Sequence, residues 1–182
     1  MFEIILGNFF ALLAMLSDSY SSSKKTTKSM LKVQNFSQLF YGLSSIVLKG
    51  YSGAVQNFIS VIRNILAIKE NKKEYIQWIL LAIAVTLGVV VNKIGIIGYL
   101  PIIANVQYTI IVLKVKNNEK ALKISFLISC ILFTVFNIYI YNFIGIISNF
   151  IIITSILIFL FKKNKNNNTN NNIQGELWKK YF

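Results

Sequence analysis

Seven polar or charged side chains inside otherwise apolar stretches are the residues of this sequence best suited to bind a polar solute. Gln56, Ser60 and Arg63 follow one another at i, i+4 and i+7, so they share one face of a helix. Amides and hydroxyls in apolar surroundings can hydrogen-bond a ligand, and a guanidinium can hold an anionic group. The candidate binding residues are Gln56, Asn57, Arg63, Asn105, Tyr108, Asn137 and Asn149.

Arg63 is the strongest of these candidates, because it stands about eleven residues into an apolar stretch, or some 16 Å of helical rise. A charge at that depth in a bilayer costs roughly 2.5–3.5 kcal/mol on insertion scales unless it is paired or hydrated. One interpretation is an anchor for an anion or polar group in a cavity open to the cytoplasm. The other is structural: Arg63 reaches the inner headgroups or pairs with Asp18.

Other polar residues recur at helical spacing and allow two interpretations. Stripes of this kind suit the lining of a polar cavity, and they also suit interhelical hydrogen bonds worth about 0.6–2 kcal/mol each. Both interpretations stay open from the sequence. The stripes are Gln34, Gln38, Tyr41 and Ser45; Asn105 and Tyr108 after Pro101; and Thr134, Asn137 and Tyr141.

The residue types that are missing exclude several kinds of chemistry. The chain has no His and one Cys, Cys130, so it offers neither His-based acid–base catalysis nor a Cys/His metal site. Asp18 is the one acidic residue expected within the membrane, and no second carboxylate lies near it in sequence. We therefore expect no enzyme activity, no cofactor and no metal site.

The elements that carry these residues are expected to be transmembrane helices. Of the 182 residues, 55% are hydrophobic and 14% charged, against about 25% charged in soluble domains. A helix needs ~20 residues to cross a bilayer, and several apolar stretches have about that length. They predict about seven spans, with six as the alternative. The stretches are 2–19, 30–48, 52–68, 75–92, 96–113, 122–141 and 143–161.

The positions of the lysines predict how these spans are oriented. Sixteen of the 19 basic residues follow the first, third, fifth or seventh stretch, whereas Lys49 and Lys93 are alone in the alternate loops. The positive-inside rule then places the N-terminus outside and the C-terminus in the cytoplasm. The basic face is expected to meet anionic lipid headgroups, not nucleic acid, because its lysines are spread over short loops with few aromatic residues.

An internal repeat is expected to organise the spans. The pattern Gly-x-x-x-Asn-Phe-Ile occurs at Gly53–Ile59 and again 92 residues later at Gly145–Ile151. Chance similarity in an Ile- and Asn-rich chain is the alternative explanation. With this repeat, we expect residues 1–161 to form one helical bundle in a parallel 3+1+3 arrangement. Its parts are a first triplet of helices over about 2–68, a linker helix over about 75–92, and a second triplet over about 96–161. Residues 162–182 form a polar Asn/Lys-rich cytoplasmic tail that we expect to be disordered.

The chain resembles the YgjV family of bacterial inner membrane proteins over about residues 5–162. The resemblance lies in Tyr51–Ala54 with Asn57 and Ile62–Asn64, in the Leu-Pro pair of Tyr99–Ile103, and in Gly145–Asn149. It implies a multi-pass protein of the bacterial cytoplasmic membrane with a layout similar to SWEET and PnuC carriers, and it implies no functional residues.

Two functions are consistent with these features. The first is a carrier or facilitator of a small polar metabolite, with its site between the two triplets. The alternative is a non-transporting membrane partner or receptor-like protein. The sequence indicates neither a particular substrate nor an oligomeric state.

Overall fold

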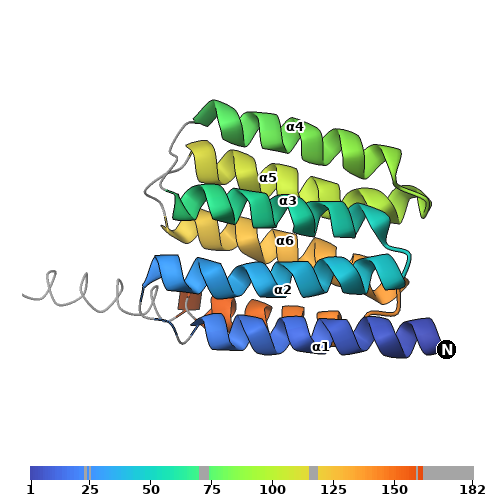
Figure 1. Cartoon of the computed structure of the whole chain (residues 1–182). Coiled ribbons are helices and arrows are strands. Elements are labelled where there is room, and N and C mark those ends of the chain that lie inside the picture. The colour runs from blue at the N-terminus through green and yellow to red at the C-terminus, as the bar shows by residue number, and fades with distance from the viewer. Residues whose placement is uncertain (23, 25, 70–73, 115–118, 159, 162–182) are drawn as a thin grey trace, which may run out of the picture.

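The chain forms helices joined by short turns in the computed structural model, which describes residues 1–22, 24, 26–69, 74–114, 119–158 and 160–161 (Figure 1). No strand occurs in that part of the chain, which confirms the all-helical prediction. The expected tail, 162–182, lies outside the described residues. The helices are α1 (Phe2–Ser22), α2 (Thr27–Val47), α3 (Tyr51–Ile68), α4 (Glu74–Val90), the 3-10 helix η1 (Gly95–Tyr99), α5 (Leu100–Lys114), α6 (Glu119–Tyr139) and a C-terminal helix (Phe143–Ile158).

These bounds agree with the seven apolar stretches of the sequence to within a few residues. At 1.5 Å per residue the 21-residue helices are about 31 Å long, close to the thickness of the hydrocarbon core. By length and composition together, Phe2–Ser21 and Lys120–Tyr139 are the two clear candidates for membrane spans among the described residues. Polar stripes lower the hydropathy of α2 and α3, so the number of membrane crossings stays a prediction.

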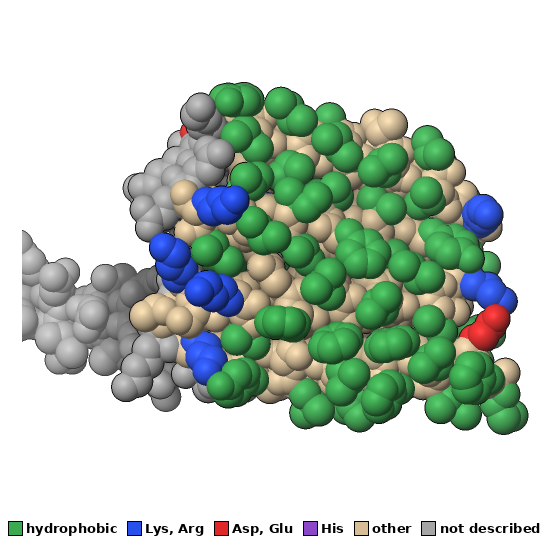
Figure 2. All heavy atoms as spheres, viewed as in Figure 1, with side chains coloured by type: hydrophobic (Ala, Val, Ile, Leu, Met, Phe, Trp, Pro, Cys, Tyr) green, Lys and Arg blue, Asp and Glu red, His purple; other side chains and the backbone are tan. Residues whose placement is uncertain are grey.

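The helices lie side by side with their axes roughly aligned, so the bundle has two ends (Figure 1). One end carries Glu3, Lys49 and Lys93, and we call it the Lys49 end. The other, where α3 ends near Lys69, we call the Lys69 end. Basic side chains gather at both ends, and the wall between them is largely hydrophobic (Figure 2). The orientation of these ends in a membrane stays a prediction.

The interior is lined by small and polar residues, whereas large apolar side chains point outward. Buried positions include Ala14, Ala84 and Ala104, together with many Ser, Thr, Asn and Gln residues. Val90 is 74% exposed and Phe9 52% exposed on the outer wall. A soluble protein would reverse this pattern, but helices in lipid gain nothing by burying apolar groups and associate through small residues and hydrogen bonds.

Two turns at the Lys49 end have the same backbone geometry 92 residues apart. After α2, Lys49 has φ 62°, and Gly50 N–H donates to Ser45 O at 2.7 Å. After α6, Tyr141 has φ 59°, and Asn142 N–H donates to Asn137 O at 2.9 Å. Both are Schellman caps in which a residue other than glycine takes the left-handed conformation. The spacing matches that of the sequence repeat.

The sequence repeat does not extend to every element. The similar segments Ile5–Gly7 and Ile96–Gly98 are 91 residues apart in sequence, and the first lies within the continuous helix α1 whereas the second lies in η1. Pro101 stands in the first turn of α5, where a missing N–H is tolerated, so it opens a helix rather than kinking one. The parallel 3+1+3 arrangement as a whole stays a prediction.

Apolar packing between helices is concentrated at the Lys49 end. The core cluster consists of Leu48, Phe136 and Ile140, with Ile4 and Leu100 among the residues packed against it. Lys49 Nζ lies 2.8 Å from Glu3 Oε2, an exposed ion pair that joins the turn after α2 to α1. Its hydrogen bond with Glu3 raises the pKa of Lys49 above the usual lysine value.

Candidate functional site

A cluster of polar side chains joins α3 to α5 inside the bundle. Asn105 Nδ2 donates to Gln56 Oε1 at 2.6 Å, and Gln56 Nε2 donates to the carbonyl of Ala84 on α4 at 3.0 Å. Both hydrogen bonds fix the orientation of the two amides. The Oδ1 atom of Asn105 is therefore left facing Arg63 and Thr109, whose donors lie 3.4 Å from it. We call Gln56, Arg63, Asn105, Tyr108 and Thr109 the α3–α5 cluster.

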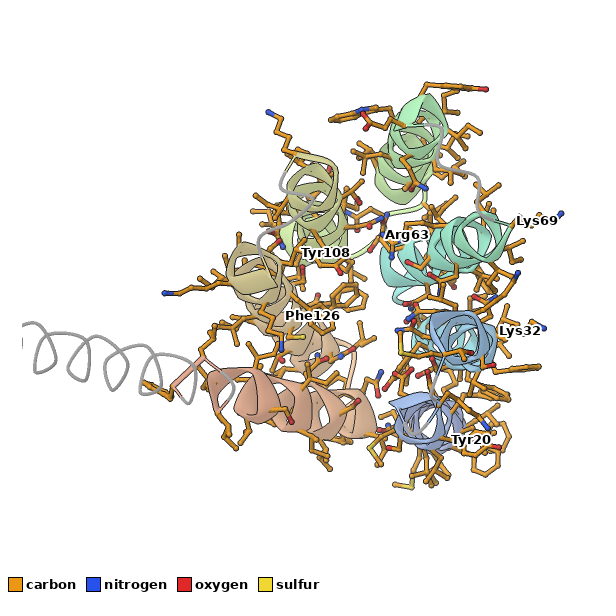
Figure 3. The ribbon with its side chains drawn as sticks, turned by 90° about the vertical axis from the view of Figure 1, so that its left-hand side faces the viewer. Tyr20, Lys32, Arg63, Lys69, Tyr108 and Phe126 are labelled. Carbon is orange, nitrogen blue, oxygen red and sulfur yellow. The ribbon has the colours of Figure 1, made fainter. Side chains whose placement is uncertain are left out.

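Arg63 is the only charged member of this cluster. Its Nη1 donates to Asn105 Oδ1 and its Nη2 to Ser60 Oγ, each at 3.4 Å, and its Cζ lies 6.0 Å from the Tyr108 ring centroid. Figure 3 shows Arg63 on α3 and Tyr108 on α5 directed into the space between these helices. Among the described residues, no carboxylate lies within 4 Å of the guanidinium. A half-buried cation is thus surrounded by neutral groups at long hydrogen-bond distances.

The space beside the cluster is too small for a metabolite in this conformation. The cavity has a volume of about 10 Å³, which is enough for about one water molecule. Helices α3, α4 and α5 all contribute to it. Its lining residues are Ile59, Arg63, Gln77, Leu80, Leu81, Asn105 and Thr109.

The structural alternative that pairs Arg63 with Asp18 is wrong. Asp18 lies on α1 and accepts a hydrogen bond from Ser37 Oγ of α2. Arg63 instead contacts its own helix and α5. The two residues are separated because α2 packs between α1 and α3, so that α1 and α3 are not neighbours in the bundle.

Four of the seven predicted binding residues meet in this cluster, and the other three lie elsewhere. Asn137 is buried near the Lys49 end, where its Oδ1 accepts from Asn142 Nδ2 at 3.3 Å. Asn57 lies half-buried on α3. Asn149 lies half-buried on the C-terminal helix, and its buried Nδ2 has no hydrogen-bond partner among the described residues. The α6 stripe ends early, because Tyr141 stands beyond α6 in the turn and is 59% exposed.

Among the described residues, polar contacts at three places join the predicted first triplet to the second. The Gln56–Asn105 pair links α3 to α5, and Tyr41 Oη lies 2.8 Å from Ser148 Oγ of the C-terminal helix. At the Lys49 end, Asn8 Nδ2 donates to the Tyr141 carbonyl at 2.9 Å, and Asn8 Oδ1 accepts from the backbone of Ile144 at 3.0 Å. The boundary between the triplets is therefore crossed by hydrogen bonds at three places.

Sequence reasoning missed two of the polar contacts that hold the helices together. Asn8 was not singled out, since a lone Asn in an apolar helix carries no periodic signal. Gln107 was also missed, although its Nε2 donates to Ser129 Oγ at 2.6 Å and its Oε1 accepts from Ser125 Oγ at 2.8 Å. The i, i+4 spacing of Ser125 and Ser129 on α6 was the available signal for this contact.

A larger hollow, of about 460 Å³, lies apart from the cluster. It is an open and mainly apolar groove between α1 and α2, so it suits lipid chains better than a polar solute. Its lining residues are Leu13, Leu16, Ser17, Tyr20, Val33, Phe36 and Phe40.

Comparison with known proteins agrees with the apolar outer wall. A family model named Imp-YgjV, described as bacterial inner membrane protein, matches residues 5–167, which is most of the chain. Searches of curated proteins and of solved structures found no match. The polar interior, the lipid-suited surface and this match lead to one conclusion: the chain belongs to the Imp-YgjV family of bacterial inner membrane proteins.

Proposed function

We propose that this inner membrane protein is a carrier or facilitator that binds a small polar metabolite between two three-helix halves. The halves comprise residues 2–68 and 96–161, with α4 as the linker between them. The observation that carries the proposal is the α3–α5 cluster, in which Gln56 and Arg63 of one half meet Asn105 and Tyr108 of the other. Ionisable residues inside membrane segments are costly and most often mark a solute or ion pathway.

The matching turns support the division into halves. Lys49 and Tyr141 have nearly the same φ, and the hydrogen bonds around them recur at a spacing of 92 residues. Each turn connects the second helix of a triplet to the third. Carriers built from repeated triplets hold their solute at the boundary between the repeats.

The polar character of the boundary supports movement between the halves. Interhelical hydrogen bonds in membrane proteins are worth about 0.6 kcal/mol on average, because the separated groups find other partners. Hydrogen bonds at three places across the boundary can therefore be exchanged at modest cost. Solute binding requires such an exchange, since the space at the cluster holds only about one water here.

A thermal-stability screen of the detergent-purified full chain tests the proposal. The panel contains nucleosides, vitamins, sugars and amino acids, and a ligand at 100 times its dissociation constant adds about 2.7 kcal/mol to stability. We expect a hit whose effect is lost in Asn105→Leu and retained in Thr154→Val. Thr154 is a matched control because its exposed hydroxyl donates only within its own helix, to Phe150 O.

Uptake of the identified compound into proteoliposomes then separates a carrier from a receptor. Uptake by the wild-type chain and its loss in Asn105→Leu would support transport. A panel without any hit, together with a membrane protein that co-purifies at fixed stoichiometry, would overturn the proposal in favour of a non-transporting partner.

A further inference from the structure

We propose that the solute is an acid, and that its carboxylate or phosphate binds the guanidinium of Arg63. This inference rests on the proposed function and adds the class of substrate to it. It begins from the charge balance at the α3–α5 cluster. Arg63 carries a permanent positive charge, and the described groups within hydrogen-bond distance of it, Asn105 Oδ1 and Ser60 Oγ, are neutral.

The donors of Arg63 are poorly used in this conformation. A guanidinium has five N–H donors, and the two described hydrogen bonds are both 3.4 Å long, beyond the usual 2.7–3.2 Å. Asn105 Oδ1 is also shared with the Thr109 hydroxyl. A carboxylate or phosphate would take two parallel N–H donors at about 2.7–2.9 Å, which is the strongest arrangement open to an arginine.

The amides beside Arg63 carry no charge that could balance the guanidinium, which favours an anionic ligand at this place. Asn105 Nδ2 is committed to Gln56 Oε1 at 2.6 Å, and Gln56 Nε2 is committed to Ala84 O at 3.0 Å. The amides are therefore locked in place next to a cation that they do not neutralise. The ring centroid of Tyr108 lies 6.0 Å from Arg63 Cζ and adds no negative charge. The position that remains open beside Arg63 is suited to an oxygen anion.

Matched pairs of compounds test this inference on the full chain in nanodiscs of zwitterionic phosphatidylcholine. In each pair the ionised carboxylate or phosphate groups of the acid are absent or replaced by amides in its partner: succinate and succinamide, nicotinate and nicotinamide, adenosine monophosphate and adenosine. We expect the melting temperature to rise with one or more of the acids and not with its neutral partner. The apparent affinity should fall at least tenfold in Arg63→Gln and stay unchanged in Lys69→Gln, an exposed position at the end of the same helix.

A second variant keeps the test valid if Arg63→Gln does not fold. Asn105→Asp places a carboxylate where Oδ1 already faces Arg63, so the charge is balanced from within. We expect this variant to fold and to lose the acid response. An unchanged response in Asn105→Asp would overturn the inference.

The remaining outcomes separate this inference from the proposed function. A neutral compound that stabilises the protein equally in wild type and Arg63→Gln would leave the carrier proposal intact and overturn the acidic substrate. An Arg63-dependent stabilisation by phosphatidylglycerol nanodiscs, with no response to any soluble acid, would assign the anion to a lipid headgroup and overturn a soluble acidic substrate. No response to any compound or lipid would overturn the inference and the carrier proposal together.

Discussion

Gln56 and Asn105 hold each other in one orientation, and that orientation decides what Arg63 meets. The 2.6 Å hydrogen bond from Asn105 Nδ2 to Gln56 Oε1 turns the Asn105 carbonyl toward the guanidinium. If the Asn105 amide were reversed, two N–H donors would face a cation. The Gln56–Asn105 pair therefore positions the carbonyl oxygen that faces Arg63. The contribution of this pair to stability can be measured separately from ligand binding.

We expect Gln56→Leu and Asn105→Leu to be energetically coupled. Each change alone should lower the free energy of unfolding in sodium dodecyl sulfate titrations by about 1 kcal/mol, because it leaves the partner amide unpaired in the bundle. The double variant should lose less than the sum of the two, by about 0.5–1.5 kcal/mol. Fully additive losses would show that the hydrogen bond contributes nothing. Thr154→Val serves as the control and should change stability by less than about 0.5 kcal/mol.

At the scale of the elements, close helix packing depends on positions without side chains. A Cβ built on Gly88 of α4 would lie 2.8 Å from Gln56 Nε2 and 2.9 Å from Ile102 Cδ1. Gly88 thus lets α4 approach both α3 and α5, as small residues do in membrane bundles. Helix α4 is therefore packed against the α3–α5 cluster at Gly88.

We expect Gly88→Val to destabilise the chain by about 1–3 kcal/mol, because its methyl groups overlap the Gln56 amide and the Ile102 side chain. The same titration in sodium dodecyl sulfate measures this loss. Ala82→Leu enlarges an exposed position of the same helix and is the matched control, with an expected change near zero. Equal losses in both variants would mean that α4 tolerates no larger side chain on any face.

The two Schellman turns give a prediction of their own. Lys49→Gly and Tyr141→Gly each remove the strain of a left-handed residue, worth about 1–2 kcal/mol, and each add backbone entropy to the unfolded chain, worth about 0.5–1 kcal/mol. We expect Tyr141→Gly to gain a net ~0.5–1 kcal/mol in the free energy of unfolding. Lys49→Gly should gain less, because it also removes the exposed ion pair with Glu3. A gain in stability for one variant and a loss for the other would indicate that the two turns are not equivalent.

Sequence reasoning predicted the helices well because each is bounded by charge or turn signals and is long enough to be recognised. It was less successful with partners, as Arg63 and Asp18 show. Both lie in helices, as predicted, but a hydrophobic pattern does not fix the rotation or neighbours of a helix. Asn105 was selected as a candidate by its polarity, while its contact with Gln56 depends on how α5 packs against α3, which only the three-dimensional structure provides.

At the scale of the whole molecule, the arrangement of the lysines predicts which end of the bundle faces outward. In intact cells, we expect Lys49→Cys and Lys93→Cys to react with a membrane-impermeant thiol reagent and Lys69→Cys to stay unlabelled. The native Cys130 is 4% exposed, so the wild-type chain is expected to give little background. If Lys69→Cys were labelled and Lys49→Cys were not, the orientation would be the opposite of the predicted one.

The concentration of apolar packing at the Lys49 end has a mechanical consequence. Leu48, Phe136 and Ile140, together with Asn8, join the helices at one end of a bundle about 30 Å long. A rigid rod of that length pivoting by about 10° moves its free end by roughly 5 Å. Arg63 lies in the half of α3 farther from the Lys49 end, so a rotation of this size about that end would open a gap of a few ångströms beside its guanidinium.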